Sequence, residues 1–148
     1  MNKNYSELFE KMRIAGKLAA KTLDEVTSFV KPGVNTNFLD KICYEYIKDN
    51  GGNSAPLYYR GFPKSCCISA NHVVCHGIPS EKMLEEGNII NIDVTAIVNG
   101  YHGDTSRMFF VGDISVKGKN LVNATYESMM KGISIIKPGI KLGNLGAI

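Results

Sequence analysis

The sequence has no long apolar run, no Cys-x-x-Cys pair and no concentration of charge of one sign. No apolar segment approaches the ~18 residues that a membrane-spanning helix needs. The apolar runs near the N-terminus are interrupted by four basic residues: Lys11, Arg13, Lys17 and Lys21. A secretory signal has an uninterrupted apolar segment, so this N-terminus does not resemble one. We therefore expect a cytoplasmic protein with no membrane partner.

Basic residues are neither abundant nor clustered. The net charge is only +3, and the lysines are scattered along the 148 residues. Proteins that bind nucleic acid usually concentrate their basic residues on one face, so we expect no direct nucleic-acid readout. The length is that of about one domain, and hydrophobic residues at 44% are enough to bury a core.

The four cysteines do not predict a disulfide framework, because the sequence carries no secretory signal. A zinc site could be drawn from the cluster Cys66, Cys67, Cys75 and His76. Its spacing, however, matches no common zinc module. The alternative is that these cysteines are buried or line a pocket, and the sequence favours this interpretation.

Hydrophobic periodicity predicts both helices and strands. Apolar residues at helical spacing indicate helices over about 8–26, 39–47 and 122–136. Strand-like runs follow a loop at 53–64, and they are expected at about 65–70, 88–97 and 101–111.

Asn99-Gly100 lies between the last two strand-like runs and is the strongest short signal for a β-hairpin. If Val98 and Tyr101 flank this turn, Thr95 lies opposite Asp104. The turn therefore fixes which side chains share a face of the hairpin, provided that no bulge shifts the pairing by one residue.

In this pairing Asp93 lies opposite Ser106, and Asp93 and Asp104 are diagonal neighbours on one face. Diagonal Cβ atoms in an antiparallel pair are roughly 7–8 Å apart or a little less. Two carboxylates at that separation can converge on a pair of metal ions ~3.5–4 Å apart. The alternative is a hairpin whose polar face is simply solvated. The same face carries Asn91, Thr95, His102 and Ser106, whereas Ile90, Ile92 and Val94 point to the other face.

A short motif occurs twice. Lys31-Pro32-Gly33-Val34 recurs as Lys137-Pro138-Gly139-Ile140, at an offset of 106 residues. We interpret this as a first repeat over 1–111 and the start of a second over 112–148. Coincidence is the alternative, because Lys-Pro-Gly is also a common ending for a helix. This interpretation predicts a pseudo-symmetric protein cut just past its middle. The short helix expected at the end of the sequence supports it, because a few residues of helix are not stable alone.

The order and spacing of five motifs resemble the bacterial-type (type I) methionine aminopeptidases from about residue 8 to the last residue. These motifs are Lys-Pro-Gly-Val (31–34), Gly-Phe-Pro-Lys-Ser (61–65), Val-Val-Cys-His-Gly-Ile-Pro (73–79), Asn-Ile-Asp-Val-Thr (91–95) and His-Gly-Asp-Thr-Ser (102–106). The resemblance implies the pita-bread fold, an α/β fold of two pseudo-symmetric halves with a dinuclear metal site between them. This chain would be a single domain over 1–148, truncated at its C-terminus, that holds the first half and the start of the second.

The implied activity is metal-dependent removal of the initiator methionine from nascent proteins with a small second residue. The implied cofactors are two divalent ions, which could be Co, Mn, Fe or Zn. The implied partners are nascent polypeptide N-termini, with the ribosome as a further candidate.

Roles follow by position. Asp93 matches the aspartate that binds one metal ion, and Asp104 matches the aspartate that bridges both. His76 matches the catalytic-site histidine that hydrogen-bonds the peptide unit of the substrate. Thr95, opposite Asp104, is expected to orient the ligands. The methionine side-chain pocket would be lined by Tyr59, Phe62 and Cys67, although ordinary packing could explain any one of them.

The resemblance also implies that part of the site is missing. The family needs a histidine and two glutamates from its second half, and no residues here match them. Two alternatives therefore remain beside a partial enzyme. One is a non-catalytic module that binds peptide or the ribosome. The other is a half-enzyme completed in trans, either by its missing C-terminal half or by a second copy of this chain.

Overall fold

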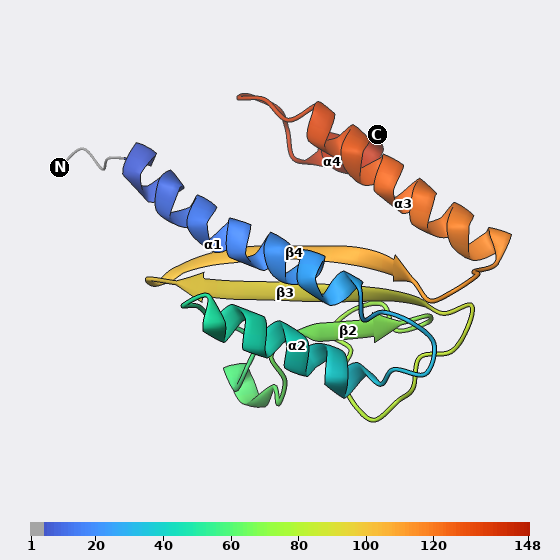
Figure 1. The fold of residues 1–148 in the computed structure, drawn as a ribbon. Coiled ribbons are helices and arrows are strands. Elements are labelled where there is room, and N and C mark those ends of the chain that lie inside the picture. The colour runs from blue at the N-terminus through green and yellow to red at the C-terminus, as the bar shows by residue number, and fades with distance from the viewer. Residues whose placement is uncertain (1–4) are drawn as a thin grey trace. The chain divides into compact units, whose positions relative to one another are not determined.

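The computed structural model describes residues 5–148 and divides into two compact units, Met1–Asp113 and Ile114–Ile148, each described by itself. The first unit contains two helices, α1 (Tyr5–Thr27) and α2 (Thr36–Asp49), and a short 3₁₀ turn, η1 (Tyr59–Gly61). Its four strands are β1 (Asn53–Ser54), β2 (Cys67–Ala70), β3 (Ile89–Val98) and β4 (Tyr101–Phe110). Figure 1 shows this order along the chain.

The sheet is antiparallel and is built around β3. β4 pairs with all ten residues of β3, from Ile89 to Val98. β2 pairs with residues 90–93 of β3, and β1 pairs with residues 96–97. A strand has two edges, so β1 and β2 lie one after the other along the edge that β4 leaves free.

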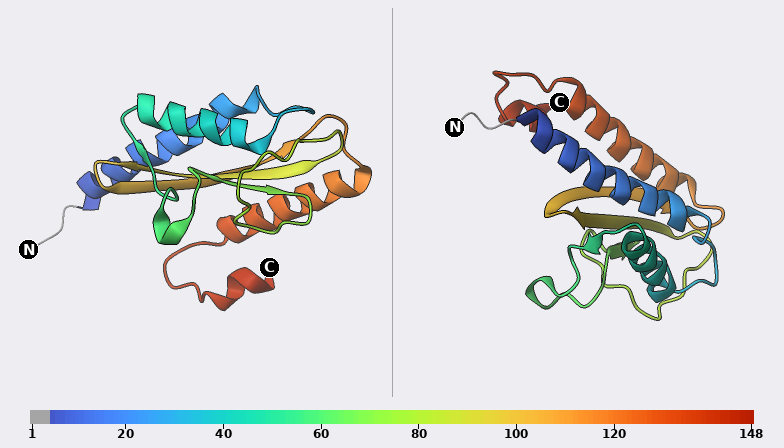
Figure 2. Two further views of the ribbon diagram at one scale, coloured as in Figure 1. Left: turned by 90° about the horizontal axis from the view of Figure 1, so that it is seen from below. Right: turned by 60° about the vertical axis from the view of Figure 1, so that its left-hand side comes forward.

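One face of β3 lines the hydrophobic core. The inward-facing residues Ile90, Ile92, Val94 and Ala96 are fully buried, whereas their neighbours in the strand are partly exposed. Both α1 and α2 lie on this side of the sheet (Figure 2). Each helix turns an apolar stripe inward: Ala15, Leu18, Ala19, Leu23 and Val26 from α1, and Leu39, Cys43 and Ile47 from α2. Alternation in β3 and helical spacing in α1 and α2 therefore lead to a one-sided core.

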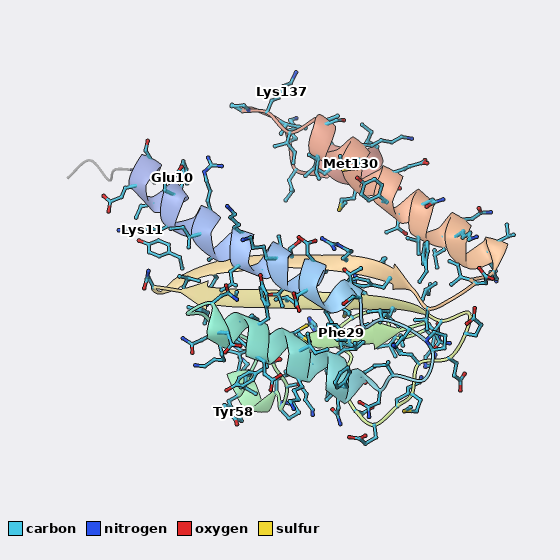
Figure 3. All side chains as sticks on the ribbon, viewed as in Figure 1. Glu10, Lys11, Phe29, Tyr58, Met130 and Lys137 are labelled. Atoms are coloured by element: carbon cyan, nitrogen blue, oxygen red, sulfur yellow. The ribbon has the colours of Figure 1, made fainter. Side chains whose placement is uncertain are left out.

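The connection between the two helices is fixed by a cap and an aromatic pair. The side chain of Asn35 accepts a hydrogen bond from the backbone N–H of Phe38 at 2.8 Å, which starts α2. Phe29, which lies just after α1 and is labelled in Figure 3, packs edge-on against Phe38. The ring centroids are 5.9 Å apart.

The hairpin forms in the predicted register. Asn99 and Gly100 have φ values of 50° and 81°, and positive φ at both positions is typical of a type I′ turn. Val98 lies opposite Tyr101, and Thr95 lies opposite Asp104. The two aspartates therefore share the sheet face that is not covered by α1 and α2.

The close packing of α1 on β4 depends on Gly103. A Cβ atom at this position would lie 2.2 Å from the backbone carbonyl carbon of Ala15, which is far inside any real contact distance. Only glycine therefore allows the helix to approach the strand this closely.

The second unit contains α3 (Val116–Ser134) and the short α4 (Gly143–Ala147). α3 begins earlier than the predicted residue 122, because the Ser115 side chain caps the helix by accepting a hydrogen bond from the Gly118 N–H at 3.1 Å. None of the helices described over 5–148 is long and apolar enough to cross a membrane.

The two Lys-Pro-Gly motifs form the same turn. The N–H of Val34 bonds to the carbonyl of Lys31 at 3.3 Å, and the N–H of Ile140 bonds to that of Lys137 at 3.2 Å. The glycines within these turns have φ values of 83° and 88°. The division of the chain into a first repeat and the start of a second stays a prediction.

Candidate metal centre

Asp93 and Asp104 occupy neighbouring strands on the face of the sheet away from the helices. Asp93 lies opposite Cys67 of β2 on one side and Ser106 of β4 on the other. The Thr95 hydroxyl donates a hydrogen bond to Oδ1 of Asp104 at 3.0 Å. A neutral donor thus orients one carboxylate of the pair through one of its oxygens.

The surroundings of Asp93 disfavour its charged form. Burial, followed by the negative charge of Asp104 and a hydrogen bond with it, raises the pKa of Asp93, and His76 partly opposes this rise. Neither aspartate forms an ion pair with a lysine or arginine in the part of the chain that the structure describes. Two close oxygen ligands without a cationic side chain suit a hard or borderline divalent cation.

These ligands make up only part of a metal site. Over residues 5–148 the structure contains no group of three or more His, Cys, Asp or Glu side chains placed to hold an ion. The Cys66–His76 cluster therefore does not form a zinc module in the described chain. The carboxylate pair fits a cation, and further ligands would be needed to hold it tightly.

Cys67 adjoins the carboxylates. Burial, and then the negative charge of Asp93, raises the pKa of the Cys67 thiol to about 11. The thiol is therefore protonated at neutral pH and behaves as a soft, weakly polar wall rather than as a nucleophile.

His76 lies in the loop that follows β2, and that loop is fastened back onto the strand. The Gly77 N–H donates to the Ser69 hydroxyl at 3.1 Å, and the Ile68 N–H donates to the Gly77 carbonyl at 2.9 Å. A Cβ atom at Gly77 would lie 2.2 Å from the carbonyl oxygen of Ile68, so the loop touches the strand only because this residue is glycine. His76 itself has a φ of 54°, in the left-handed region. This fastening keeps His76 close enough to affect the charge of Asp93.

Tyr59 and Phe62 belong to the loop around η1. The loop is closed by a hydrogen bond from the Tyr58 N–H to the Phe62 carbonyl at 2.8 Å. Tyr59 is 64% exposed, and the Arg60 guanidinium lies 5.4 Å from the centroid of its ring. Tyr58 points outward at the edge of the molecule (Figure 3).

Of the residues predicted for the site, the structure brings together Asp93, Asp104, Thr95, Cys67 and His76. In the described chain no hydrogen bond or aromatic contact joins Tyr59 or Phe62 to them.

One buried carboxylate beside the η1 loop was not predicted from the sequence. Asp40 of α2 is 8% exposed and accepts hydrogen bonds from the residues that lead into β2. A signal was present, because Asp40 occupies the same helix face as Cys43 and Ile47, where an apolar residue is expected.

Comparison with known proteins places the chain in a family. The model of metallopeptidase family M24 matches residues 10–148. The methionine aminopeptidase of Rickettsia prowazekii is 57% identical over 138 residues, which are 93% of this chain and 53% of the relative. That of Escherichia coli K12 is 52% identical over 143 residues, 95% of this chain and 54% of the relative. This chain thus spans about half the length of the curated relatives it matches.

Comparison with solved structures supports the same assignment. The crystal structure of methionine aminopeptidase from R. prowazekii superposes with a TM-score of 0.93 at 56% identity, covering 95% of this chain and 57% of that one. A prolidase from Pyrococcus furiosus has a TM-score of 0.81 at 23% identity, covering 94% and 40%, which supports the fold alone. These neighbours share the pita-bread fold, so the expected fold class is confirmed. The resemblance to type I methionine aminopeptidases is likewise confirmed, and the chain belongs to metallopeptidase family M24.

Proposed function

We propose that this chain carries one part of the active site of a methionine aminopeptidase, which removes the initiator methionine from nascent proteins with a small second residue. The observation that carries the proposal is the pairing of Asp93 and Asp104 on one open sheet face, with Thr95 hydrogen-bonded to Asp104. A purely structural hairpin gains nothing from placing Asp104 where it raises the pKa of the partly buried Asp93.

Asp93 and Asp104 would hold divalent ions, which could be Co, Mn, Fe or Zn. Two such ions, when bound, supply electrophilic activation of the scissile carbonyl and a nucleophile at neutral pH. Thr95 would hold the Asp104 carboxylate in one orientation by its hydrogen bond to Oδ1. His76 would donate a hydrogen bond to the peptide unit of the substrate during attack, from a loop anchored on β2.

The methionine side chain would contact Tyr59, Phe62 and Cys67. Aromatic walls and a protonated thiol suit a flexible thioether, because sulfur and aromatic rings attract each other weakly without charge. The substrates would be nascent polypeptide N-termini in the cytoplasm, with the ribosome as a partner. The remaining metal ligands would come from outside these 148 residues, in the same longer protein or in trans.

A chimeric enzyme tests this function. Residues 10–148 would replace the matching segment of the R. prowazekii methionine aminopeptidase, whose 57% identity makes the junction compatible. We expect the chimera, supplied with Mn²⁺, to release free methionine from a Met-Gly tripeptide. Asp93→Asn keeps the shape of the side chain but removes its charge, and it should abolish the release.

His102→Ala is the matched control. His102 lies on the same face of β4 as Asp104 but opposite Ile97, and we assign it no role. This variant should keep the activity of the chimera. A folded chimera that releases no methionine would contradict the proposed function, and full activity in Asp93→Asn would show that Asp93 is not a ligand.

A further inference from the structure

Asp40 is a buried carboxylate that ties α2 to a segment 25 residues later in the chain. Its Oδ1 accepts hydrogen bonds from the backbone N–H groups of Ser65 at 2.9 Å and of Cys66 at 3.0 Å. The Ser65 hydroxyl lies 2.6 Å from the same oxygen and 3.1 Å from the Asp40 carbonyl oxygen. One side chain of a helix thus holds two consecutive amides of a loop.

The position of these amides makes the contact significant. Ser65 and Cys66 are the last residues before β2, whose first residue, Cys67, lies opposite Asp93. On the other side of the junction, three residues before Ser65, is Phe62. Asp40 therefore anchors the junction between the loop around η1, which carries Phe62, and β2, which lies beside Asp93.

The energetics favour a fixed junction. Asp40 is 8% exposed, and Ser65 and Cys66 are 2% and 0% exposed. A buried carboxylate is tolerated only when donors replace its lost water, and this one has four, because the Cys66 thiol also lies 3.4 Å from Oδ1. Removing it would leave two buried amides without an acceptor, which costs more than an ordinary hydrogen bond gains.

We infer that Asp40 is a positioning residue for the pocket that receives the methionine side chain, because its carboxylate fixes Phe62 and Cys67 on either side of the Ser65–Cys66 junction. The inference rests on the proposed function for the identity of the pocket. The clamp itself does not depend on that function, so the two can be tested separately.

Amide hydrogen exchange on the ¹⁵N-labelled chain tests the clamp. In Asp40→Ala the amides of Ser65 and Cys66 should exchange at least about tenfold faster than in the parent chain, since a lost charged hydrogen bond exceeds one tenfold step. The amide of Val94, in the centre of β3, should keep its rate. Asp40→Asn retains an oxygen acceptor and should restore most of the protection.

Kinetics of the chimera test the consequence for substrate binding. A loosened pocket should raise KM for a Met-Gly tripeptide about tenfold in Asp40→Ala, with kcat within about threefold, and Asp40→Asn should restore KM. Partial unfolding alone would remove active molecules, so it would lower the apparent kcat and leave KM unchanged.

The outcomes are distinguishable. Unchanged exchange at Ser65 and Cys66 in Asp40→Ala, or a fall in kcat at constant KM, overturns the inference. If the parent chimera is inactive, the proposed function fails, and the exchange experiment still decides whether the clamp exists. If Asp40→Ala does not fold, Asp40→Asn replaces it. An amide oxygen is a weaker acceptor than a carboxylate, so Ser65 and Cys66 should still exchange measurably faster than in the parent chain, and equal exchange would overturn the inference.

Discussion

Asp93→Asn should make the metal-free chain more stable at neutral pH. The pKa of Asp93 is raised, chiefly by burial and then by Asp104, so the folded state holds a proton more tightly than the unfolded state does. Such a carboxyl stabilises the fold only below its ordinary pKa, and this contribution is lost as the pH rises through the raised value. At pH 7 the ionised Asp93 is therefore a cost, which the amide of asparagine removes.

The repulsion between the two carboxylates gives a minimum size for this gain, because burial of Asp93 adds to it. We take the charges of the two carboxylates to be ~6 Å apart, a little less than the distance between diagonal Cβ atoms. Coulomb's law then gives a repulsion of ~0.7 kcal/mol in water and ~2.8 kcal/mol at an effective dielectric constant of 20. Asp104 is exposed and Asp93 is only partly buried, so the value lies toward the water limit. We expect Asp93→Asn to increase the free energy of unfolding by about 1 kcal/mol at low ionic strength.

Urea denaturation followed by circular dichroism measures this difference. With EDTA at pH 7 the variant should be the more stable protein, and near pH 3, where the parent carboxyl is protonated, the two should agree. Added Mn²⁺ should reverse the order, because an ion that binds only the folded parent stabilises it by mass action. A variant less stable than the parent in EDTA at pH 7, or a difference that does not change with pH, would refute this reasoning.

Three other substitutions test the site and its scaffold. Thr95→Val removes the hydrogen bond to Asp104 and should weaken Mn²⁺ binding by the chimera about 10- to 100-fold, as measured by calorimetry. Unchanged affinity would argue against an orienting role for Thr95. His76→Ala should lower kcat of the chimera about 10²-fold or more while far-ultraviolet circular dichroism stays the same, and a change in KM alone would contradict a role in the chemical step. Gly103→Ala should lower the free energy of unfolding by more than about 2 kcal/mol in urea denaturation, because the new methyl group meets the backbone of Ala15. A neutral effect would show that α1 can shift.

The hairpin could be predicted from sequence because local rules determine it. Asn99-Gly100 permits positive φ at both turn positions, and the alternation of Ile90, Ile92 and Val94 leaves one pairing that buries them all. The shared face of Asp93 and Asp104 follows from that pairing.

Other features depend on contacts that local patterns do not encode. α3 begins at Val116 rather than at the first apolar position because a cap, not periodicity, starts it. The Asp40 clamp joins residues 25 apart, and nothing near Asp40 in sequence names Ser65 and Cys66 as its partners. Likewise, the approach of α1 to Gly103 is set by tertiary packing between distant segments.

We propose that these 148 residues supply Asp93 and Asp104 to a metal site that other residues complete. Release of free methionine from a Met-Gly tripeptide by the purified chain alone tests this proposal, with Mn²⁺ or Co²⁺ added and Asp93→Asn as control. We expect no release from a chain that circular dichroism shows to be folded. Release that disappears in Asp93→Asn would contradict this proposal, because the chain would then hold or assemble a complete site.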